Sequence, residues 1–225
     1  EASYDKNREK ICSMRFESLA QIISQSGIHS GTRVLVMDST SGLLVGSLAY
    51  RMRGKGLILA LYGGQQPHLE MSQSFNLTTE ELAIIQVHIY FLYTQPVTTT
   101  TAVEDTTTTT TTSIKGMHRT GKTDAEREKV RSYLRQGVDR LIIACKYRPL
   151  PILKQALYVL QPSSSFVIFH EFLEPLVDCY LYLQANGLAL RLVLSDTWMR
   201  EFQTLPGRVR PDMYMSTTGG YILSG

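Results

Sequence analysis

Short runs of apolar residues alternate along the chain with stretches in which apolar residues recur every three or four positions. The first such group is an apolar run at 34–37, a periodic stretch at 43–52 and a second apolar run at 57–62. Runs of this length are typical of buried strands, and the periodic stretch is typical of a helix with one buried face. Together they predict a strand–helix–strand unit with parallel strands.

Helical stretches and apolar runs also alternate before and after this unit. Spacing of apolar residues predicts a helix over 16–26 before it. After residue 123 the pattern predicts helices at 124–136, 152–160 and 175–185 and strands at 141–145, 166–170, 188–194 and 213–223. The fold class predicted is therefore α/β: a Rossmann-like, mostly parallel sheet with antiparallel edge strands at its end.

Two segments interrupt the pattern. Residues 78–93 combine a helix start at Glu80-Glu81 with several β-branched and aromatic residues, and of the two interpretations we favour a helix. Residues 95–122 are rich in threonine and have little apolar material to bury, so a flexible insert is expected there. With 43% hydrophobic residues, the chain fits a single domain, 1–225, interrupted by this insert.

The turn after the first strand is the place where a fold of this kind binds a nucleotide-like cofactor. A working turn needs closely spaced glycines, as in G-x-G-x-x-G. Here Ser39, Thr40 and Ser41 fill the turn, and its glycines are Gly42 and Gly46. The second strand ends in Tyr-Gly-Gly, without the acid that holds a ribose. The chain is either an inactive copy of a cofactor-binding domain or an ordinary parallel sheet, and Asp38 at the strand end favours the first.

Other candidate chemistry is sparse. The loop at 146–151 has no acid or amide to orient a base, and His170 and Glu171 should face opposite ways in a strand. The five histidines lack the spacing of metal ligands, and Ser195 lacks the glycines of a nucleophile elbow. We therefore predict no catalytic and no metal site. Three scattered cysteines indicate a reducing compartment, and the apolar stretch at 82–93 is too short to span a membrane.

Positive charge is concentrated in one segment although the net charge is only +3. Between residues 115 and 148 there are ten Lys and Arg residues against four Asp and Glu residues. Arg127, Arg131 and Arg135 are four positions apart and should form one stripe on a helix. Such a stripe is either a solvated surface or a contact for phosphates.

Four segments resemble one family: 7–17, 28–31, 195–198 with Leu205-Pro206 downstream, and 219–225. They look like the non-catalytic subunit of eukaryotic tRNA (adenine-58-N1)-methyltransferase. The resemblance implies a class I methyltransferase fold, a nuclear location and no cofactor of its own. It also implies a catalytic partner subunit that binds S-adenosylmethionine, a heterotetramer of two such pairs, and binding to tRNA. An N-terminal barrel domain would precede a chain of this kind, and no membrane partner is expected.

Two sets of site residues follow from this interpretation. The expected tRNA-binding residues are Lys122, Arg127, Lys129, Arg131 and Arg135. The expected partner interface lies in the final strands, because an apolar sheet edge needs a cover. It comprises Trp198, Met213, Met215, Gly219, Gly220, Tyr221 and Leu223. These strands could instead complete the chain's own core. Two rival functions are an active methyltransferase with an atypical cofactor loop and a scaffold that does not contact RNA.

Overall fold

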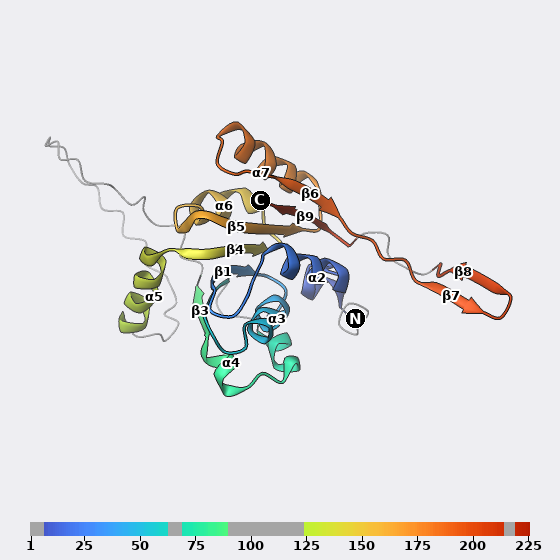
Figure 1. Ribbon diagram of the computed structural model, residues 1–225, viewed down its shortest axis with the longest axis horizontal. Coiled ribbons are helices and arrows are strands. Elements are labelled where there is room, and N and C mark those ends of the chain that lie inside the picture. Colours follow the sequence, from blue (N-terminus) through green and yellow to red (C-terminus); the bar gives the residue numbers. More distant parts are fainter. Residues whose placement is uncertain (1–6, 63–68, 90–123, 214–218) are drawn as a thin grey trace, which may run out of the picture.

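A seven-stranded sheet forms the centre of the protein, as a computed structural model shows (Figure 1). The structure describes residues 7–62, 69–89, 124–213 and 219–225. The strands lie in the order β3-β2-β1-β4-β5-β9-β6. Their bounds are β1 (Arg33–Asp38), β2 (Leu57–Tyr62), β3 (Ile85–Ile89), β4 (Val138–Ala144), β5 (Leu160–His170), β6 (Val193–Asp196) and β9 (Tyr221–Ser224).

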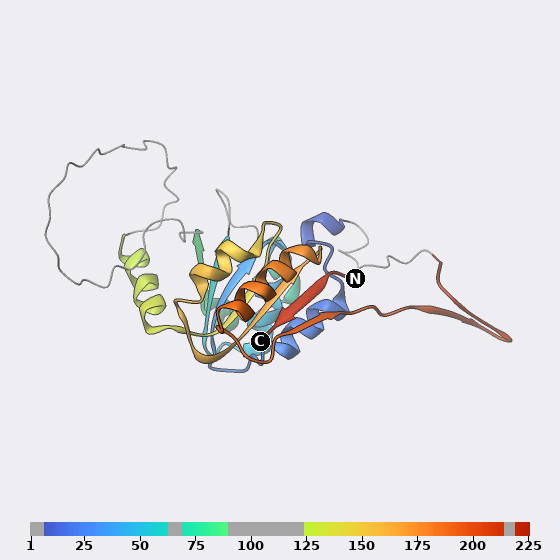
Figure 2. The same cartoon turned by 90° about the horizontal axis from the view of Figure 1, so that it is seen from above.

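Helices cover both faces of this sheet (Figures 1 and 2). One face packs against α2 (Phe16–Gln25) and α3 (Leu43–Met52), and α4 (Thr79–Ala83) contacts α3 and β3 on that side. The other packs against α5 (Asp124–Gln136), α6 (Pro149–Ala156) and α7 (Glu174–Ala185). Two short 3-10 helices, η1 (Arg8–Ile11) and η2 (Glu70–Phe75), accompany the sheet and its covering helices.

The apolar runs form central strands because both of their faces are buried. In β1, Val34 and Val36 belong to the core on the α2–α3 side, and Leu35 and Met37 belong to the core on the α6–α7 side. Such strands have no polar face, which explains why their sequence is continuously apolar rather than alternating.

The predicted fold class is confirmed, with one refinement. Strands β1 to β5 run parallel to one another, and β9 is antiparallel to both β5 and β6. The antiparallel strand β9 therefore lies inside the sheet, and the edge strand on that side is β6. Both are shorter than the sequence pattern suggested, since the predictions were 188–194 and 213–223.

The helix predicted over 78–93 is correct only at Thr79–Ala83 and wrong at Ile85–Ile89, and residues 90–93 lie outside the described part of the chain. Thr78 caps a single turn of helix, because its hydroxyl accepts from the Glu81 N–H and the Glu81 carboxylate accepts from the Thr78 N–H. The chain then turns at Ile84 and forms β3, which pairs in parallel with β2. Pairing with an available sheet edge outweighed the helix-forming start of the segment. The threonine-rich insert lies outside the described residues.

A β-hairpin that the pattern did not predict projects from the body of the protein (Figures 1 and 2). Strands β7 (Phe202–Leu205) and β8 (Arg208–Pro211) pair with each other around a Pro206-Gly207 turn and with no other described strand. We call residues 199–212 the arm. Its Phe202, Leu205 and Val209 are all at least half exposed, so the arm buries little apolar surface of its own.

Candidate functional site

The polar groups of the turn after β1 form hydrogen bonds within the turn and with the start of α3. One oxygen of the Asp38 carboxylate accepts hydrogen bonds from the N–H and the hydroxyl of Thr40, at 2.6 and 2.5 Å. The other oxygen accepts from the Val45 N–H at 3.3 Å. Burial raises the pKa of Asp38 above its usual value, and the hydrogen bonds from Thr40 oppose that shift. The acid at the strand end therefore holds the start of α3 rather than facing a ligand.

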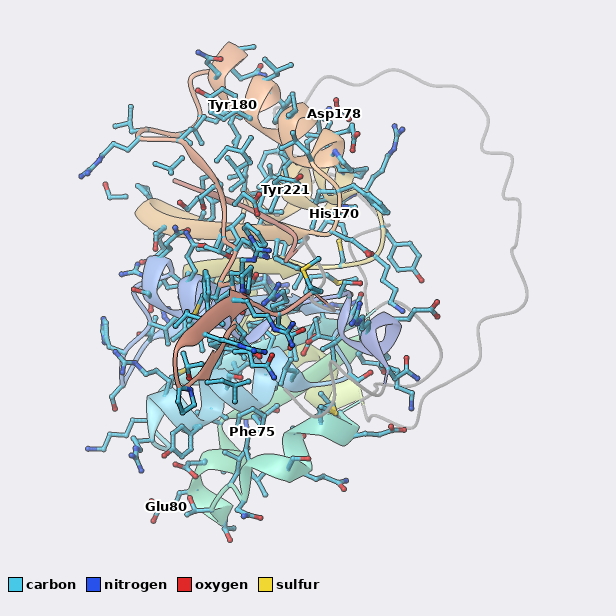
Figure 3. The ribbon with its side chains drawn as sticks, turned by 90° about the vertical axis from the view of Figure 1, so that its right-hand side faces the viewer. Phe75, Glu80, His170, Asp178, Tyr180 and Tyr221 are labelled. Carbon is cyan, nitrogen blue, oxygen red and sulfur yellow. The ribbon has the colours of Figure 1, made fainter. Side chains whose placement is uncertain are left out.

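The two glycines of the turn make room for η2. Gly42 has a φ of +87°, and a Cβ there would lie 2.7 Å from the Cα of Leu69. A Cβ on Gly46 would lie 2.6 Å from the ring of Phe75, a residue labelled in Figure 3. The Met71 N–H also donates to the Ser41 carbonyl at 3.0 Å. Close backbone approach thus occurs at this turn, but the approaching backbone is the chain's own.

The segment around η1 lies against the same turn. The Ser41 hydroxyl donates to the Lys10 carbonyl at 3.1 Å, and the Cys12 thiol donates to the Ser39 carbonyl at 3.4 Å. An exposed ion pair of 3.8 Å, between Lys10 and Glu70, joins η1 to η2. The predicted turn residues Ser39 to Gly46 are therefore contacted from two sides by protein. This arrangement favours the interpretation of the turn as a degenerate copy of a cofactor loop.

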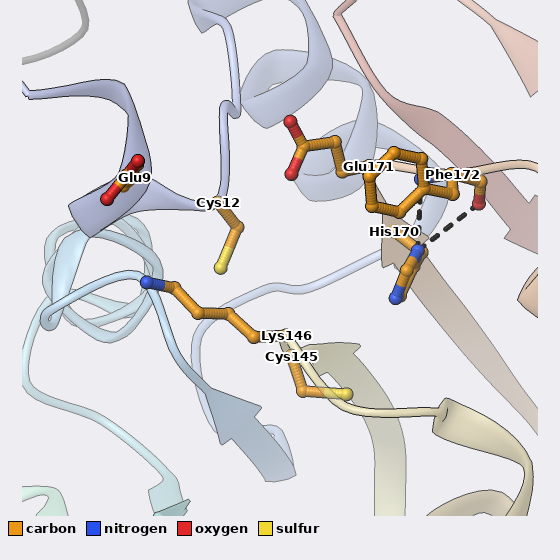
Figure 4. Close-up of a pocket in the computed structure, with 7 residues that line it drawn as sticks. All are labelled: Glu9, Cys12, Cys145, Lys146, His170, Glu171 and Phe172. Atoms are coloured by element: carbon orange, nitrogen blue, oxygen red, sulfur yellow. Dashed lines mark hydrogen bonds between the residues drawn. The ribbon is translucent and has the colours of Figure 1, made fainter.

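A cavity of about 210 Å³ lies beyond the carboxyl ends of β4 and β5 (Figure 4). It is lined by Glu9, Cys12, Cys145, Lys146, His170, Glu171 and Phe172. Sites for drug-sized ligands and cofactors are usually about 300–1,000 Å³. The cavity is thus too small for a whole nucleotide cofactor, although it lies at the sheet edge where such folds bind their ligands.

The groups that line the cavity are poorly suited to catalysis. Burial raises the pKa of the Cys12 and Cys145 thiols to about 12, so both stay protonated and weakly nucleophilic at neutral pH. Burial lowers the pKa of His170, whose Nδ1 accepts from the Phe172 N–H at 3.0 Å. The Glu171 carboxylate accepts from the Ser13 hydroxyl at 2.8 Å. Among the residues that the structure describes, no group of three acids, histidines or cysteines could hold a metal ion.

Part of the predicted tRNA-binding stripe lies on a well-formed helix. The inner face of α5 packs through Val130, Tyr133 and Leu134, while Lys129, Arg131 and Arg135 are exposed. Both arginines pair with Glu128, at 3.4 and 3.2 Å. Lys122 and the side chain of Arg127 lie outside the described part. Arg131 and Arg135 are therefore both exposed on α5, as the predicted stripe requires, but the single negative charge of Glu128 offsets half of their positive charge.

The predicted partner-interface residues fall into two groups. Leu223 is fully buried in the chain's own core, and Gly219 and Gly220 are buried as well. A Cβ on Gly220 would lie 2.5 Å from the ring of Phe169, so this glycine serves internal packing. Tyr221 is half-buried and pairs with His170 and Asp196. By contrast, Trp198 and Met213 are exposed by 47% and 79%, and they flank the arm. Met215 lies outside the described residues.

The base of the arm is held by the polar face of α2, a feature that the sequence reading missed. Arg15 and Glu17 form an ion pair of 2.7 Å whose side chains are less than 10% exposed. The Arg15 guanidinium donates to the Met199 carbonyl, and the Glu17 carboxylate accepts from the Met199 N–H. The Ser18 hydroxyl donates to the Gly219 carbonyl at 2.7 Å. Charged residues at the start of an amphipathic helix were the available signal.

The strand order and the degenerate turn define a class of protein: a Rossmann-like methyltransferase fold without an intact cofactor loop. Solved structures agree on the fold. An S-adenosylmethionine-dependent O-methyltransferase from Thermotoga maritima superposes with a TM-score of 0.62 at 16% identity, covering 98% of this chain and 68% of that one. A tRNA (m1A58) methyltransferase from Aquifex aeolicus gives a TM-score of 0.60 at 13% identity, covering 93% and 67%.

Sequence comparison then identifies the family. Residues 1–121 match the Gcd10p family, and the chain belongs to it. It is 32% identical to the tRNA (adenine(58)-N(1))-methyltransferase non-catalytic subunit trm6 of Dictyostelium discoideum, over all of this chain and 48% of the relative. Identity to the mouse (Mus musculus) protein with the corresponding name is 28%, over 99% of this chain and 57% of the relative. The chain thus spans about half the length of these relatives.

In the described part of the chain, no helix is both long enough and apolar enough to cross a membrane.

Proposed function

We propose that this chain is the methyltransferase-like part of a non-catalytic subunit of a tRNA methyltransferase. It pairs with a catalytic subunit, contributes to tRNA binding, and leaves S-adenosylmethionine to its partner. One observation carries the proposal: the turn that would cradle a cofactor is contacted instead by the chain's own η1 and η2. The names of its relatives support the same function. A nuclear location and a tetramer of two heterodimers complete the proposal.

The chain alone should not bind S-adenosylmethionine. The contacts made by Gly42 and Gly46 leave no backbone free to approach a ligand closely, and the nearby cavity is below the size of a cofactor site. Isothermal titration calorimetry should show no binding heat for the chain, with an active methyltransferase of the same fold as the positive control. Micromolar binding by this chain would instead support the rival function, an active enzyme with an atypical loop.

The tRNA contact is proposed at α5, where Arg131 and Arg135 present two guanidinium groups to solvent. Folded RNA is recognised largely through its shape and phosphates, so a basic stripe needs no base readout. Lys129 lies on the same exposed helix, and Lys122 and Arg127 extend the proposal beyond the described side chains. Glu128 competes with phosphate for both arginines.

Changing both described arginines, R131Q/R135Q, should weaken tRNA binding by the assembled complex. Each lost phosphate contact should lower the slope of log affinity against log salt by about one. The matched variant Glu128→Gln should do the opposite, because it frees both guanidinium groups without altering the buried face of α5. Filter binding across a salt series measures both. If both variants form the complex and keep the wild-type slope of log affinity against log salt, α5 is a solvated surface without RNA contact. That result would favour the scaffold function.

The contact with the catalytic partner is proposed at the arm and its base, through Trp198 and Met213 together with the hairpin. A lone two-stranded hairpin is marginally stable in water, and exposed apolar residues on it mark an interaction surface. β7 and β8 pair with no third strand in the part of the chain that the structure describes, so another chain can add a strand to the hairpin. The interior residues Gly219, Gly220 and Leu223 would support this surface from within rather than contact the partner.

A further inference from the structure

Two neighbouring loops at the carboxyl edge of the sheet carry exposed aromatic rings beside exposed cations. The loop after β4 presents Lys146, Tyr147 and Arg148, all of them exposed. The loop after β5 presents Phe172. Tyr147 is 60% exposed and Phe172 is 59% exposed. Neither ring belongs to the two core clusters, and one side of the Phe172 ring contacts the His170 ring, with the ring centroids 5.8 Å apart.

The sheet places these loops at the same level. β4 and β5 are parallel neighbours, and Ala144 pairs with Phe169, the last pair before the strands end. Adjacent strands lie about 4.8 Å apart, so the two loops leave the sheet side by side. The cavity of about 210 Å³ opens here, and Cys145, Lys146, His170 and Phe172 contribute to its wall (Figure 4).

The cations of this edge are more available than those of α5. Within the described part of the chain, neither Lys146 nor Arg148 forms an ion pair, whereas Arg131 and Arg135 share Glu128. Acids also lie nearby, and one of them, Glu174, interacts electrostatically with His170. The Glu171 carboxylate accepts from Ser13, and Glu9 lines the cavity on the η1 side.

The cavity has the size and polarity for one heterocyclic ring. An apolar cavity of about 150 Å³ binds benzene, so the 210 Å³ here suit a somewhat larger ring such as a purine. Nδ1 of His170 lies 3.0 Å from the Phe172 nitrogen and 3.2 Å from the Phe172 carbonyl oxygen, so the backbone of Phe172 fixes the imidazole at the cavity wall. The protonated thiols of Cys12 and Cys145 add soft, uncharged surface.

We propose that the loops after β4 and β5 form a binding site for unpaired nucleotides of RNA. Tyr147 and Phe172 stack on bases, Lys146 and Arg148 contact the flanking phosphates, and the cavity receives a single base. Exposed aromatic rings interleaved with cations are the usual means of binding single-stranded nucleic acid, because every base has a face to stack. This inference rests on the proposed tRNA-binding function and adds a second site, one that binds single strands, to the stripe on α5.

The test uses the chain with a short fluorescent single-stranded oligoadenylate and a duplex RNA of the same length. The variant Y147L/F172L removes both stacking rings at exposed positions, so the fold should be unaffected. Its affinity for the single strand should fall by roughly ten-fold or more in fluorescence anisotropy, while duplex binding changes little. Tyr158→Leu is the matched control, since Tyr158 is 90% exposed but precedes β5 at the opposite edge of the sheet.

Other results separate this inference from the proposed function. Equal loss in the Tyr158→Leu control, or an unchanged affinity in Y147L/F172L, would overturn the nucleotide site. If R131Q/R135Q still weakens tRNA binding in that case, the proposed function stands without it. If the wild-type chain and its assembled complex bind neither probe nor tRNA, both proposals fail. Circular dichroism of each variant confirms that a lost signal is not lost folding.

Discussion

Deleting Tyr221–Gly225 is expected to unfold the domain rather than to detach it from a partner. β9 lies between β5 and β6 and pairs with both. Its Ile222 and Leu223 are fully buried on opposite faces of the sheet. Losing a buried Ile or Leu side chain costs about 2–5 kcal/mol. Two such losses and two broken strand ladders would consume most of the roughly 5–15 kcal/mol by which domains are stable.

The matched variant replaces Phe202–Pro211 by a short Gly-Ser linker. Every residue of β7 is exposed and β8 is nearly so, so the thermal transition of this variant should match that of the wild type. Co-purification with the catalytic partner should be lost if the arm is the contact. The pair of variants thus separates folding from assembly. A truncated chain that lacks 221–225 but melts cooperatively at the wild-type temperature would contradict the internal position of β9.

Arg15→Met is expected to destabilise the domain by about 3–5 kcal/mol, because it leaves the Glu17 carboxylate buried without its cation. The second oxygen of Glu17 has no hydrogen-bond partner among the described residues, and the first would keep the Met199 N–H, which carries no charge to balance the carboxylate. The double variant R15M/E17L should recover most of that loss, since apolar residues of similar volume often replace a buried ion pair at little cost. Urea denaturation of both variants measures the difference.

A surface pair is the control for this experiment. Lys10 and Glu70 are 60% and 70% exposed and 3.8 Å apart. Solvent screens such a pair, so Lys10→Met should change stability by less than about 1 kcal/mol. The double variant R15M/E17L, although stable, loses both contacts to Met199 and should assemble less well with the partner. Equal stability losses in the single and double variants would show that Arg15 contributes packing rather than charge balance.

Much of the fold could be predicted from the sequence because its central strands are buried on both faces. The apolar run at 34–37 and the amphipathic stretch at 43–52 correspond to β1 and α3. The failures have a common physical cause. Ile84 to Ile89 joined an available sheet edge, and Tyr221 to Ser224 entered between two distant strands. Both outcomes depend on pairing with strands that are distant in the sequence, and a local pattern of residues does not contain that information.

The sequence predicted that the cofactor loop is degenerate, but it did not predict which residues of the chain pack against that loop. The serines and threonine at 39–41 indicated a degenerate turn. Nothing local showed that Leu69 and Phe75 would pack on Gly42 and Gly46. Gly219 and Gly220 were predicted to belong to the partner interface, whereas a Cβ on Gly220 would lie 2.5 Å from the Phe169 ring of the same chain. A glycine can indicate that other atoms lie close to the backbone. The sequence does not show whether those atoms belong to the same chain or to a partner.

The internal position of β9 also bears on how the protein is made. A ribosome delivers residues in order, so β5 leaves it long before β9 does. Until residue 224 has emerged, β5 has no neighbour on that side, and β6 has no strand to pair with. An apolar strand with an open edge is prone to associate with other chains. The nascent domain therefore needs protection, by a chaperone or by its assembly partner, until the last strand of the sheet arrives.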